Sequence, residues 1–471
     1  MASFLLSECL ENIFLYLDEV NEPPSSTSKY KDLHSCTLVS RHWCRISTPF
    51  LYAYPFHPFC YSSWCSINDL ISYSKFIRTL LSCVPQIEIK RICTTYAQVL
   101  SAKHIPLNKT FSCSSTFNYV SFIRGLILNE TFLNSQNLLN YKAIWLSAHN
   151  QELLSASTII KVMNHFLEFL IENCNNLAML EISLTMDSSN SIKLSQFITS
   201  LLLHQRGLKH IKISGYFVIN NTWDAPDLSV YSAILNLLPT QSKSLQKLEF
   251  ESLSFDNIGL NSLCLVKNIR ELKLNMIGFS SSLSSWSCWA KNLTKLRVLE
   301  ISNYSSHSKD FIIQLFQLFS NTLVKLIIAD CNTLEPYPDI ENLMMGSLYQ
   351  QVSLHLHSLI HLEVPLIYPT ELISIFKSCS QLVYLSVKLI SDENLKSLGE
   401  FIPKTLKRIH FIFVTVTHFE ESLRCFLEGY INNDGSLRSL VFKHNRRWFN
   451  NNGHKSLVYK KSDIQITLIE L

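Results

Sequence analysis

Residues 296–301 read Leu-Arg-Val-Leu-Glu-Ile, and residues 323–328 read Leu-Val-Lys-Leu-Ile-Ile. Both follow one pattern, with an apolar residue at the first, fourth and sixth positions. Side chains alternate between the two faces of a strand, so the second half of each copy predicts a short strand with one apolar face. A strand this short cannot bury that face by itself. The pattern therefore implies neighbouring elements that cover the apolar face.

The same pattern recurs along most of the chain, and from Leu177 onward its copies lie 23 to 37 residues apart. Full copies begin at Leu177, Leu208, Leu245, Ile269, Leu296, Leu323, Leu359, Leu382, Leu406 and Leu437, and a weaker copy begins at Ile123. Apolar residues at helical spacing lie between copies, for example in 159–170, 311–319 and 395–402. Each unit is therefore predicted to be a helix followed by a strand, and stacked units would share one continuous core.

These units resemble the irregular, cysteine-type leucine-rich repeats that are often joined to an F-box, including those of large fungal F-box families. The resemblance implies an α/β repeat over residues 119–471, a horseshoe-shaped solenoid with a concave parallel sheet. The longer intervals would hold insertions on the convex side. The Asn or Cys ladder position of the family is mostly missing, and Cys331 is its best match. The alternating tail at 462–471 is expected to close the last unit.

The strand residues between the apolar positions are expected to point to the concave face. In the first two full copies they include Met179, Glu181, His210 and Lys212. In the later copies the candidates for binding a protein ligand are Lys247, Glu249, Glu271, Lys273, Glu300, Lys325, His361, Glu363, Tyr384, Arg408 and His410. Because the face mixes both charge signs, it suits a protein ligand better than a polyanion. We expect fewer than about a third of these residues to contact a partner.

The N-terminal segment carries a second, independent pattern. Residues 5–17 read Leu-Leu-Ser-Glu-Cys-Leu-Glu-Asn-Ile-Phe-Leu-Tyr-Leu, and residues 38–43 read Leu-Val-Ser-Arg-His-Trp. One helical stripe runs from Leu6 to Leu17, with Ser7 as its predicted cap, and a second runs from Leu33 to Ile46, opened by Asp32. A helical module below about 40 residues usually needs a partner to be stable.

Residues 3–50 resemble an F-box, whose pattern is a Leu-Pro-x-Glu-x-Leu-x-x-Ile helix followed by a Val-Ser-Arg-x-Trp run. Ser7 replaces the usual proline, and residues 21–29 lengthen the gap between the two halves. The alternative is a plain two-helix start to a larger core. The resemblance implies docking on a ligase adaptor subunit through Leu6, Leu10, Ile13, Phe14, Leu17, Leu33, Val39 and Trp43, with Trp43 mainly holding the module together. The predicted domains are the module (1–57), a linking or capping helical segment (58–118) and the repeat array (119–471).

Composition limits the remaining functions. The net charge of +4 over 471 residues gives no strong field for nucleic acid or a membrane surface. The 14 cysteines lack CxxC spacing, which favours free thiols over zinc ligands or disulfides. No signal peptide or membrane-spanning stretch is recognised, so we expect a soluble protein of the cytoplasm or nucleus.

No pattern for catalysis stands out, and we expect neither an enzyme nor a cofactor. His355, His357 and His361 have loosely metal-like spacing, but they are better explained as histidines of the concave face or its rim. Cys331 and Cys379 are considered as nucleophiles and interpreted instead as buried thiols.

Together the two resemblances imply a substrate-recognition subunit of an SCF-type cullin–RING ubiquitin ligase, binding its adaptor subunit and a protein substrate. The alternative is an interaction scaffold whose degenerate F-box has no ligase role, which Ser7 and the long gap would favour.

Overall fold

The computed structural model describes most repeats and the N-terminal helices. The described residues are 5–18, 27–56, 67–84, 117–129, 156–183, 188–215, 228–253, 260–275, 283–303, 309–329, 338–391, 394–413, 419–431, 437–444 and 465–470. The chain divides into two compact units, residues 1–245 and residues 246–471. No described helix is long and apolar enough to cross a membrane.

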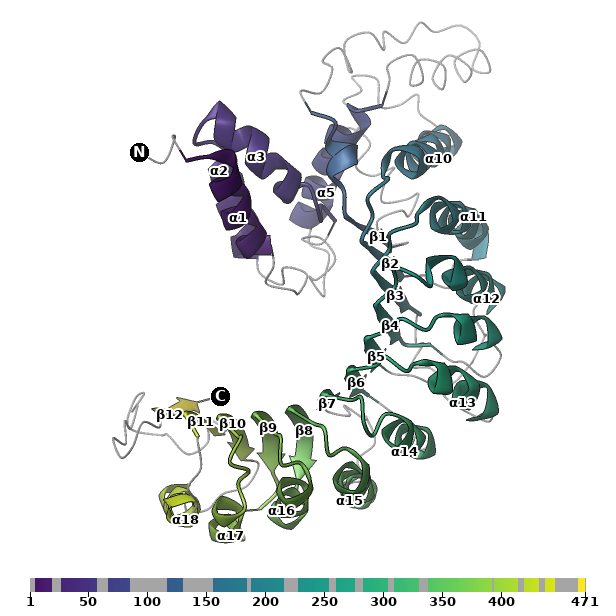
Figure 1. Cartoon of the computed structure of the whole chain (residues 1–471). Helices are drawn as coiled ribbons and strands as arrows, with labels where there is room; N and C mark the ends of the chain where they lie inside the picture. Colours follow the sequence, from purple (N-terminus) through teal and green to yellow (C-terminus); the bar gives the residue numbers. More distant parts are fainter. Residues whose placement is uncertain are drawn as a thin grey trace, which may run out of the picture. The chain divides into compact units, whose positions relative to one another are not determined.

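The first unit begins with helices and continues as helix–strand repeats (Figure 1). Its opening helices are α1 (Ser7–Asp18), α2 (Thr27–Thr37), α3 (Arg41–Leu51), α5 (Ile67–Leu81) and the 3-10 helix η3 (Tyr119–Phe122). Its repeats comprise β1 (Gly125–Asn129), α10 (Ala156–Asn173), β2 (Met179–Ser183), α11 (Ser188–His204), β3 (His210–Ser214), α12 (Leu228–Leu237) and η5 (Leu238–Gln241). The strands pair in parallel, with Gly125 opposite Met179 and Met179 opposite His210.

The predicted second stripe of the N-terminal module is two helices rather than one. It starts at Thr27, before the predicted Asp32, and breaks after Thr37. The break follows from Ser40, which caps α3 by accepting a hydrogen bond from the Trp43 backbone N–H at 3.2 Å.

The second unit continues the repeat in chain order. Its first half comprises β4 (Lys247–Glu251), η6 (Leu260–Leu265), β5 (Glu271–Asn275), α13 (Leu283–Asn292), β6 (Val298–Ser302), α14 (Lys309–Leu318), β7 (Lys325–Ile328) and α15 (Pro338–His355). Its second half comprises β8 (His361–Ile367), α16 (Pro369–Ser378), β9 (Tyr384–Leu389), α17 (Leu395–Glu400), β10 (Arg408–Phe413), α18 (Phe419–Ile431), β11 (Ser439–His444) and β12 (Gln465–Glu470).

From β5 onward, every described strand of this second unit pairs in parallel with the strand before it in sequence. The helices lie along one face of the sheet, and we call the other the open face (Figure 1). The tail pairs with β11 as β12, as its alternation predicts.

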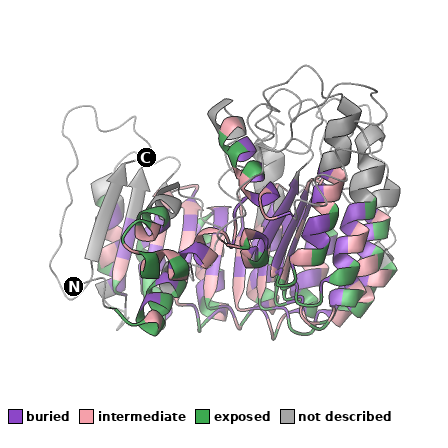
Figure 2. Ribbon diagram, turned by 90° about the horizontal axis from the view of Figure 1, so that it is seen from above, coloured by how far each residue is buried: buried purple, intermediate pink, exposed green. Residues whose placement is uncertain are grey.

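The repeat pattern explains the core. The three apolar positions of one copy, Leu296, Leu299 and Ile301, are at most 2% exposed, and Phe311 and Phe316 of the following helix are equally buried. Each such side chain contributes about 1.5–3 kcal/mol by leaving water. Figure 2 shows buried residues along the strands and exposed residues gathered on the helices and turns. The chain is therefore an α/β repeat with a parallel sheet, consistent with a leucine-rich-repeat-like solenoid.

A fixed backbone contact joins successive repeats. The carbonyl of Arg270 accepts from the N–H groups of Arg297 and Val298 at 2.8 and 2.9 Å, and the carbonyl of Arg297 accepts from the next repeat in the same way. The pattern extends to the N-terminal module, where the carbonyl of Ala53 accepts from Arg124 and Gly125 at 2.7 and 2.9 Å. The segment after α3 therefore makes the first of these contacts between successive units, and we call it the first rung of the array.

Aromatic rings fill the space beside that rung. Tyr52 lies 4.4 Å from Tyr119 between ring centroids, and Phe56 lies 5.3 Å from Phe76 of α5. Burial is the main cause that raises the pKa of Tyr52 to about 12. These contacts tie the end of α3 to α5 and η3. The division into domains at residues 57 and 118 stays a prediction.

Buried polar side chains form a ladder at the repeat boundaries. Gln205 donates to the Cys174 carbonyl at 2.5 Å, and Gln241 donates to the Gln205 carbonyl at 2.6 Å. In the second unit the Cys379 thiol meets the Leu356 carbonyl at 3.2 Å. These ladder residues therefore stand before the copies that begin at Leu177, Leu208, Leu245 and Leu382. Cys331, the ladder residue proposed from sequence, lies outside the described residues.

Candidate functional site

The N-terminal module has a small core of its own. Leu10, Phe14, Leu33 and Phe50 are each 9% exposed or less, and Trp43 packs its ring edge-on to Phe14 at 5.9 Å. Three of the residues proposed as adaptor contacts, Leu10, Phe14 and Leu33, are therefore inside the module. Their burial is what allows α1, α2 and α3 to pack, so they are not available to a partner.

Other apolar residues of the module stay exposed. Leu6 is 68% exposed, Ile13 45% and Val39 51%. The sequence-based site omitted Leu38, which is 73% exposed because it lies in the turn between α2 and α3. Its signal was its place directly before Val39 in the Val-Ser-Arg-x-Trp run. The side chain of Leu17 lies outside those described.

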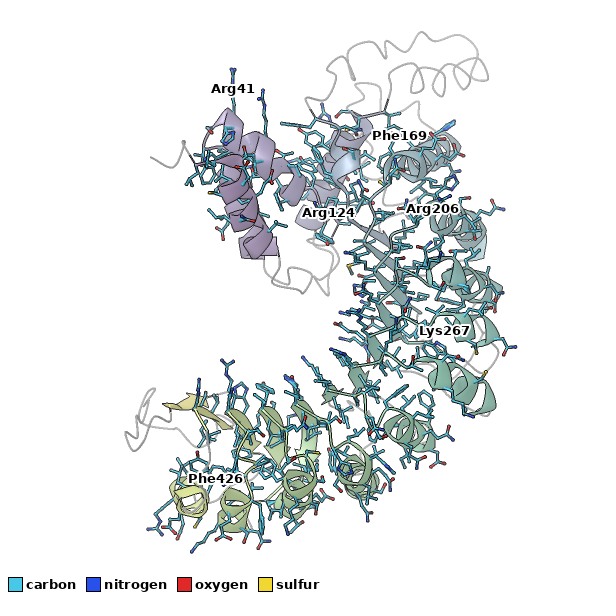
Figure 3. The ribbon with its side chains drawn as sticks, viewed as in Figure 1. Arg41, Arg124, Phe169, Arg206, Lys267 and Phe426 are labelled. Atoms are coloured by element: carbon cyan, nitrogen blue, oxygen red, sulfur yellow. The ribbon has the colours of Figure 1, made fainter. Side chains whose placement is uncertain are left out.

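One contact brings three of these exposed residues, Leu6, Leu38 and Val39, to the same end of the module. The Nε2 atom of His42, at the start of α3, lies 3.3 Å from the carbonyl oxygen of Leu5. The start of α1, with Leu6, therefore lies near the turn that holds Leu38 and Val39. Ile13 follows Leu6 by two helical turns and falls on the same stripe. Arg41 extends outward beside this end of the module (Figure 3). We call Leu6, Ile13, Leu38 and Val39 the apolar end patch.

The second candidate surface is the open face of the second unit. All eleven proposed ligand-binding residues lie at the strand positions that alternate with the core, as predicted. Strand register aligns them in two rows. With their neighbours on the same strands, the residues at the earlier strand position form one row: Lys247, Glu271, Val298, Lys325, His361, Tyr384 and Arg408. The residues two positions later form the second row: Glu249, Lys273, Glu300, Ile327, Glu363, Ser386 and His410.

The corresponding positions of β2, in the first unit, are buried. Met179 is 6% exposed and Glu181 is 7% exposed, and Lys212 meets Glu181 at 2.9 Å. Strand β2 therefore offers little surface to a ligand at these two positions.

Charges on β4, β5 and β6 pair with one another. Lys247 lies 2.8 Å from Glu249 and 3.9 Å from Glu271, and Lys273 lies 2.6 Å from Glu300. Burial opposes the charged form of Lys247, but the charge and hydrogen bond of Glu249 outweigh it, so the pKa of Lys247 is raised.

An aromatic and imidazole cluster follows on β8, β9 and β10. His361 meets Glu363 at 2.6 Å and stacks on Tyr384 with ring centroids 4.2 Å apart. The Tyr384 hydroxyl lies 3.1 Å from Nδ1 of His410. The hydrogen bond from His361, then the nearby charges of Lys325 and His410, hold the pKa of Glu363 below its usual value against the effect of burial.

The described residues contain no group of three or more side chains suited to hold a metal ion. His355 and His361 are not on one strand, because His355 ends α15 and lies 3.2 Å from Gln351 there. Cys379 is fully buried, and burial raises its pKa to about 11. A buried thiol with a raised pKa is a poor nucleophile.

Comparison with known proteins adds little. No protein-family model matches the sequence, and no curated protein matches it closely enough to be a relative. A chain in a crystal structure of the yeast Rad7 and Elc1 complex is similar at a TM-score of 0.34 and 14% identity, covering 65% of this chain and 77% of that chain. A likeness of this size carries no argument about fold or function.

Proposed function

We propose that this protein is the substrate-recognition subunit of an SCF-type cullin–RING ubiquitin ligase in the cytoplasm or nucleus. The F-box-like module of α1, α2 and α3 would dock on the ligase adaptor subunit, and the repeat array would bind a protein substrate. The chain would perform no chemistry itself and would act by bringing substrate and ubiquitin-charged enzyme together.

The observation that carries this proposal is the apolar end patch. The module already has a core, so Leu6, Ile13, Leu38 and Val39 are not needed inside it. Exposed apolar residues gathered in one region mark interaction sites, and a stable interface buries about 1,200–2,000 Å² in all. The F-box resemblance names the partner that this patch would meet.

The alternative is a scaffold whose degenerate F-box has lost the adaptor. Ser7 and the long gap between the two halves of the F-box-like segment are the features that favour it. Ser7, however, is the first residue of α1, so the helix begins at this position without the usual proline. The substitution therefore leaves the start of the helix intact, and the ligase proposal remains the stronger of the two.

Substitution in the patch distinguishes the two proposals. Ile13→Asp and Leu38→Asp in the full chain should each weaken binding to the purified adaptor subunit by at least about tenfold, because a charge enters an apolar interface. Asn12→Asp is the matched control for Ile13→Asp, since it adds the same charge at a neighbouring exposed position of α1. Biolayer interferometry measures the affinities, and circular dichroism checks the fold. Equal binding by Ile13→Asp and Asn12→Asp would count against the patch.

A further inference from the structure

The open face of the second unit is divided by charge rather than evenly mixed. Over β4, β5 and β6 it carries two lysines against four glutamates: Lys247, Lys273, Glu249, Glu251, Glu271 and Glu300. Both lysines lie in ion pairs with glutamates of the same face. This part of the face is acidic, and its cations are already engaged.

The balance reverses over β7 to β10. Three cations stand there, Lys325, Lys388 and Arg408, against the single carboxylate Glu363. No salt bridge to Lys325 or Arg408 occurs among the residues that the structure describes. Lys325 is half-buried, and Arg408 is exposed.

The one carboxylate of this region is occupied. Glu363 accepts from His361 at 2.6 Å, and its side chain is 34% exposed. His361 in turn stacks on Tyr384, whose hydroxyl meets His410. Glu363 therefore orients the ring stack, and its negative charge is partly balanced by its surroundings.

Strand register gives the spacing of Lys325 and Arg408, the two cations that lie in no described salt bridge. Lys325, His361, Tyr384 and Arg408 stand side by side in one row, on four consecutive strands. Strands lie about 4.8 Å apart, so the row spans about 14 Å between the backbones of Lys325 and Arg408. An extended peptide advances about 3.3 Å per residue and covers that span in about four residues.

We propose that the open face over β7 to β10 binds an acidic segment of a protein in extended form. Carboxylates about four residues apart would meet Lys325 and Arg408, and the intervening residues would lie across the His361–Tyr384 stack. This inference rests on the proposed function in that the segment would belong to the substrate. It names the chemical class of that substrate: a peptide rich in Asp and Glu.

Peptide binding to the full chain tests this inference. The probe is a labelled Gly/Ser decapeptide carrying two Asp-Glu pairs separated by two residues, and its partner carries Asn-Gln in their place. Microscale thermophoresis should show saturable binding of the acidic peptide and at least about tenfold weaker binding of the amide peptide.

Charge reversal locates the site. Lys325→Glu and Arg408→Glu should each weaken binding of the acidic peptide by about tenfold. Lys396→Glu is the matched control: it makes the same charge change at an exposed position of α17, away from the open face, and should alter binding by less than about twofold. Circular dichroism confirms that all three variants fold.

Three results would overturn the inference: no saturable binding up to about 1 mM peptide, equal losses in Lys396→Glu and Lys325→Glu, or a short DNA duplex binding as tightly through the same two cations. Adaptor binding, measured in parallel, separates this inference from the ligase proposal. Peptide binding without adaptor binding would overturn only the ligase role, and adaptor binding without peptide binding would overturn only the acidic substrate.

Discussion

At the scale of single residues, the buried ladder side chains carry a stabilising role that the sequence pattern did not reveal. Cys174, Gln205 and Cys379 each stand three residues before the first apolar residue of a copy. This three-residue spacing can be seen in the sequence. Cysteine and glutamine differ chemically, however, so the sequence alone does not show that they play the same role. Only the structure shows that each meets a carbonyl of the preceding repeat.

The ladder predicts a cost for removing one amide. Gln241 is 1% exposed and donates to the carbonyls of Leu202 and Gln205 at 2.9 and 2.6 Å. Gln241→Leu keeps the size but leaves two buried acceptors without this donor, so stability should fall by about 1–3 kcal/mol. Urea unfolding measures the loss. Gln350→Leu, at an exposed amide of α15, should change stability by less than about 0.5 kcal/mol; equal effects of the two would show that the ladder does not stabilise the repeats.

The carboxyl of Glu363 gives a prediction about pH. Its pKa is lower in the folded chain than its usual 4.5, because His361 donates a hydrogen bond to it. The unfolded chain therefore binds the proton more readily, so the stabilisation is complete above pH 4.5 and is lost as the pH falls through the folded pKa. Glu363→Gln should lower Tm at pH 7, and the difference from wild type should shrink toward pH 3. A Tm difference of the same size at both pH values would contradict this assignment.

At the scale of elements, the helices and strands of the repeats follow their patterns, but the N-terminal module does not. Periodicity predicts α10, α14 and α17 because each buries one continuous apolar stripe. It fails between α2 and α3 because the stripe continues through Leu38 and Val39, while the Ser40 cap starts a new helix. The apolar spacing predicted one continuous helix, but the Ser40 cap divides it into α2 and α3. The same turn exposes two residues of the apolar end patch.

Two glycines allow α17 and α18 to approach closely, side by side in Figure 1. A Cβ atom added at Gly429 would collide with the backbone carbonyl of Lys396, and one added at Gly399 would collide with the carbonyl of Phe426. The phenyl ring of Phe426, labelled in Figure 3, packs at 5.3 Å from Phe411 and holds α18 against β10. A side chain at either glycine would therefore push the two helices apart, and α18 would lose core contacts.

We expect Gly429→Ala to destabilise the second unit by about 1–3 kcal/mol through overpacking, although alanine favours a helix by about 1 kcal/mol. Gly207→Ala is the control, because a Cβ atom there would have no neighbour within 4 Å. Hydrogen exchange of α17 and α18, together with the urea midpoint, measures the effect. Unchanged protection in Gly429→Ala would mean that the helices are not in close contact.

At the scale of the whole molecule, the chain combines a helical module with a repeat array, and the two are joined by backbone hydrogen bonds within the first unit. Ala53 accepts from Arg124 and Gly125, so deleting the module would also remove the first rung of the array. Function is therefore better tested with substitutions in the full chain than with truncations. The fold class could be predicted from sequence because ten copies repeat one pattern. The contact residues could not, because a stripe does not distinguish a core from a docking surface.

The most direct test of the ligase proposal is complex formation by the unmodified chain. Purified full-length protein and purified SCF adaptor subunit are mixed and analysed by size-exclusion chromatography with light scattering. The account predicts a single species with the mass of a one-to-one complex, which Ile13→Asp should not form. Separate elution of the two wild-type proteins at micromolar concentration would contradict the account and leave the scaffold alternative.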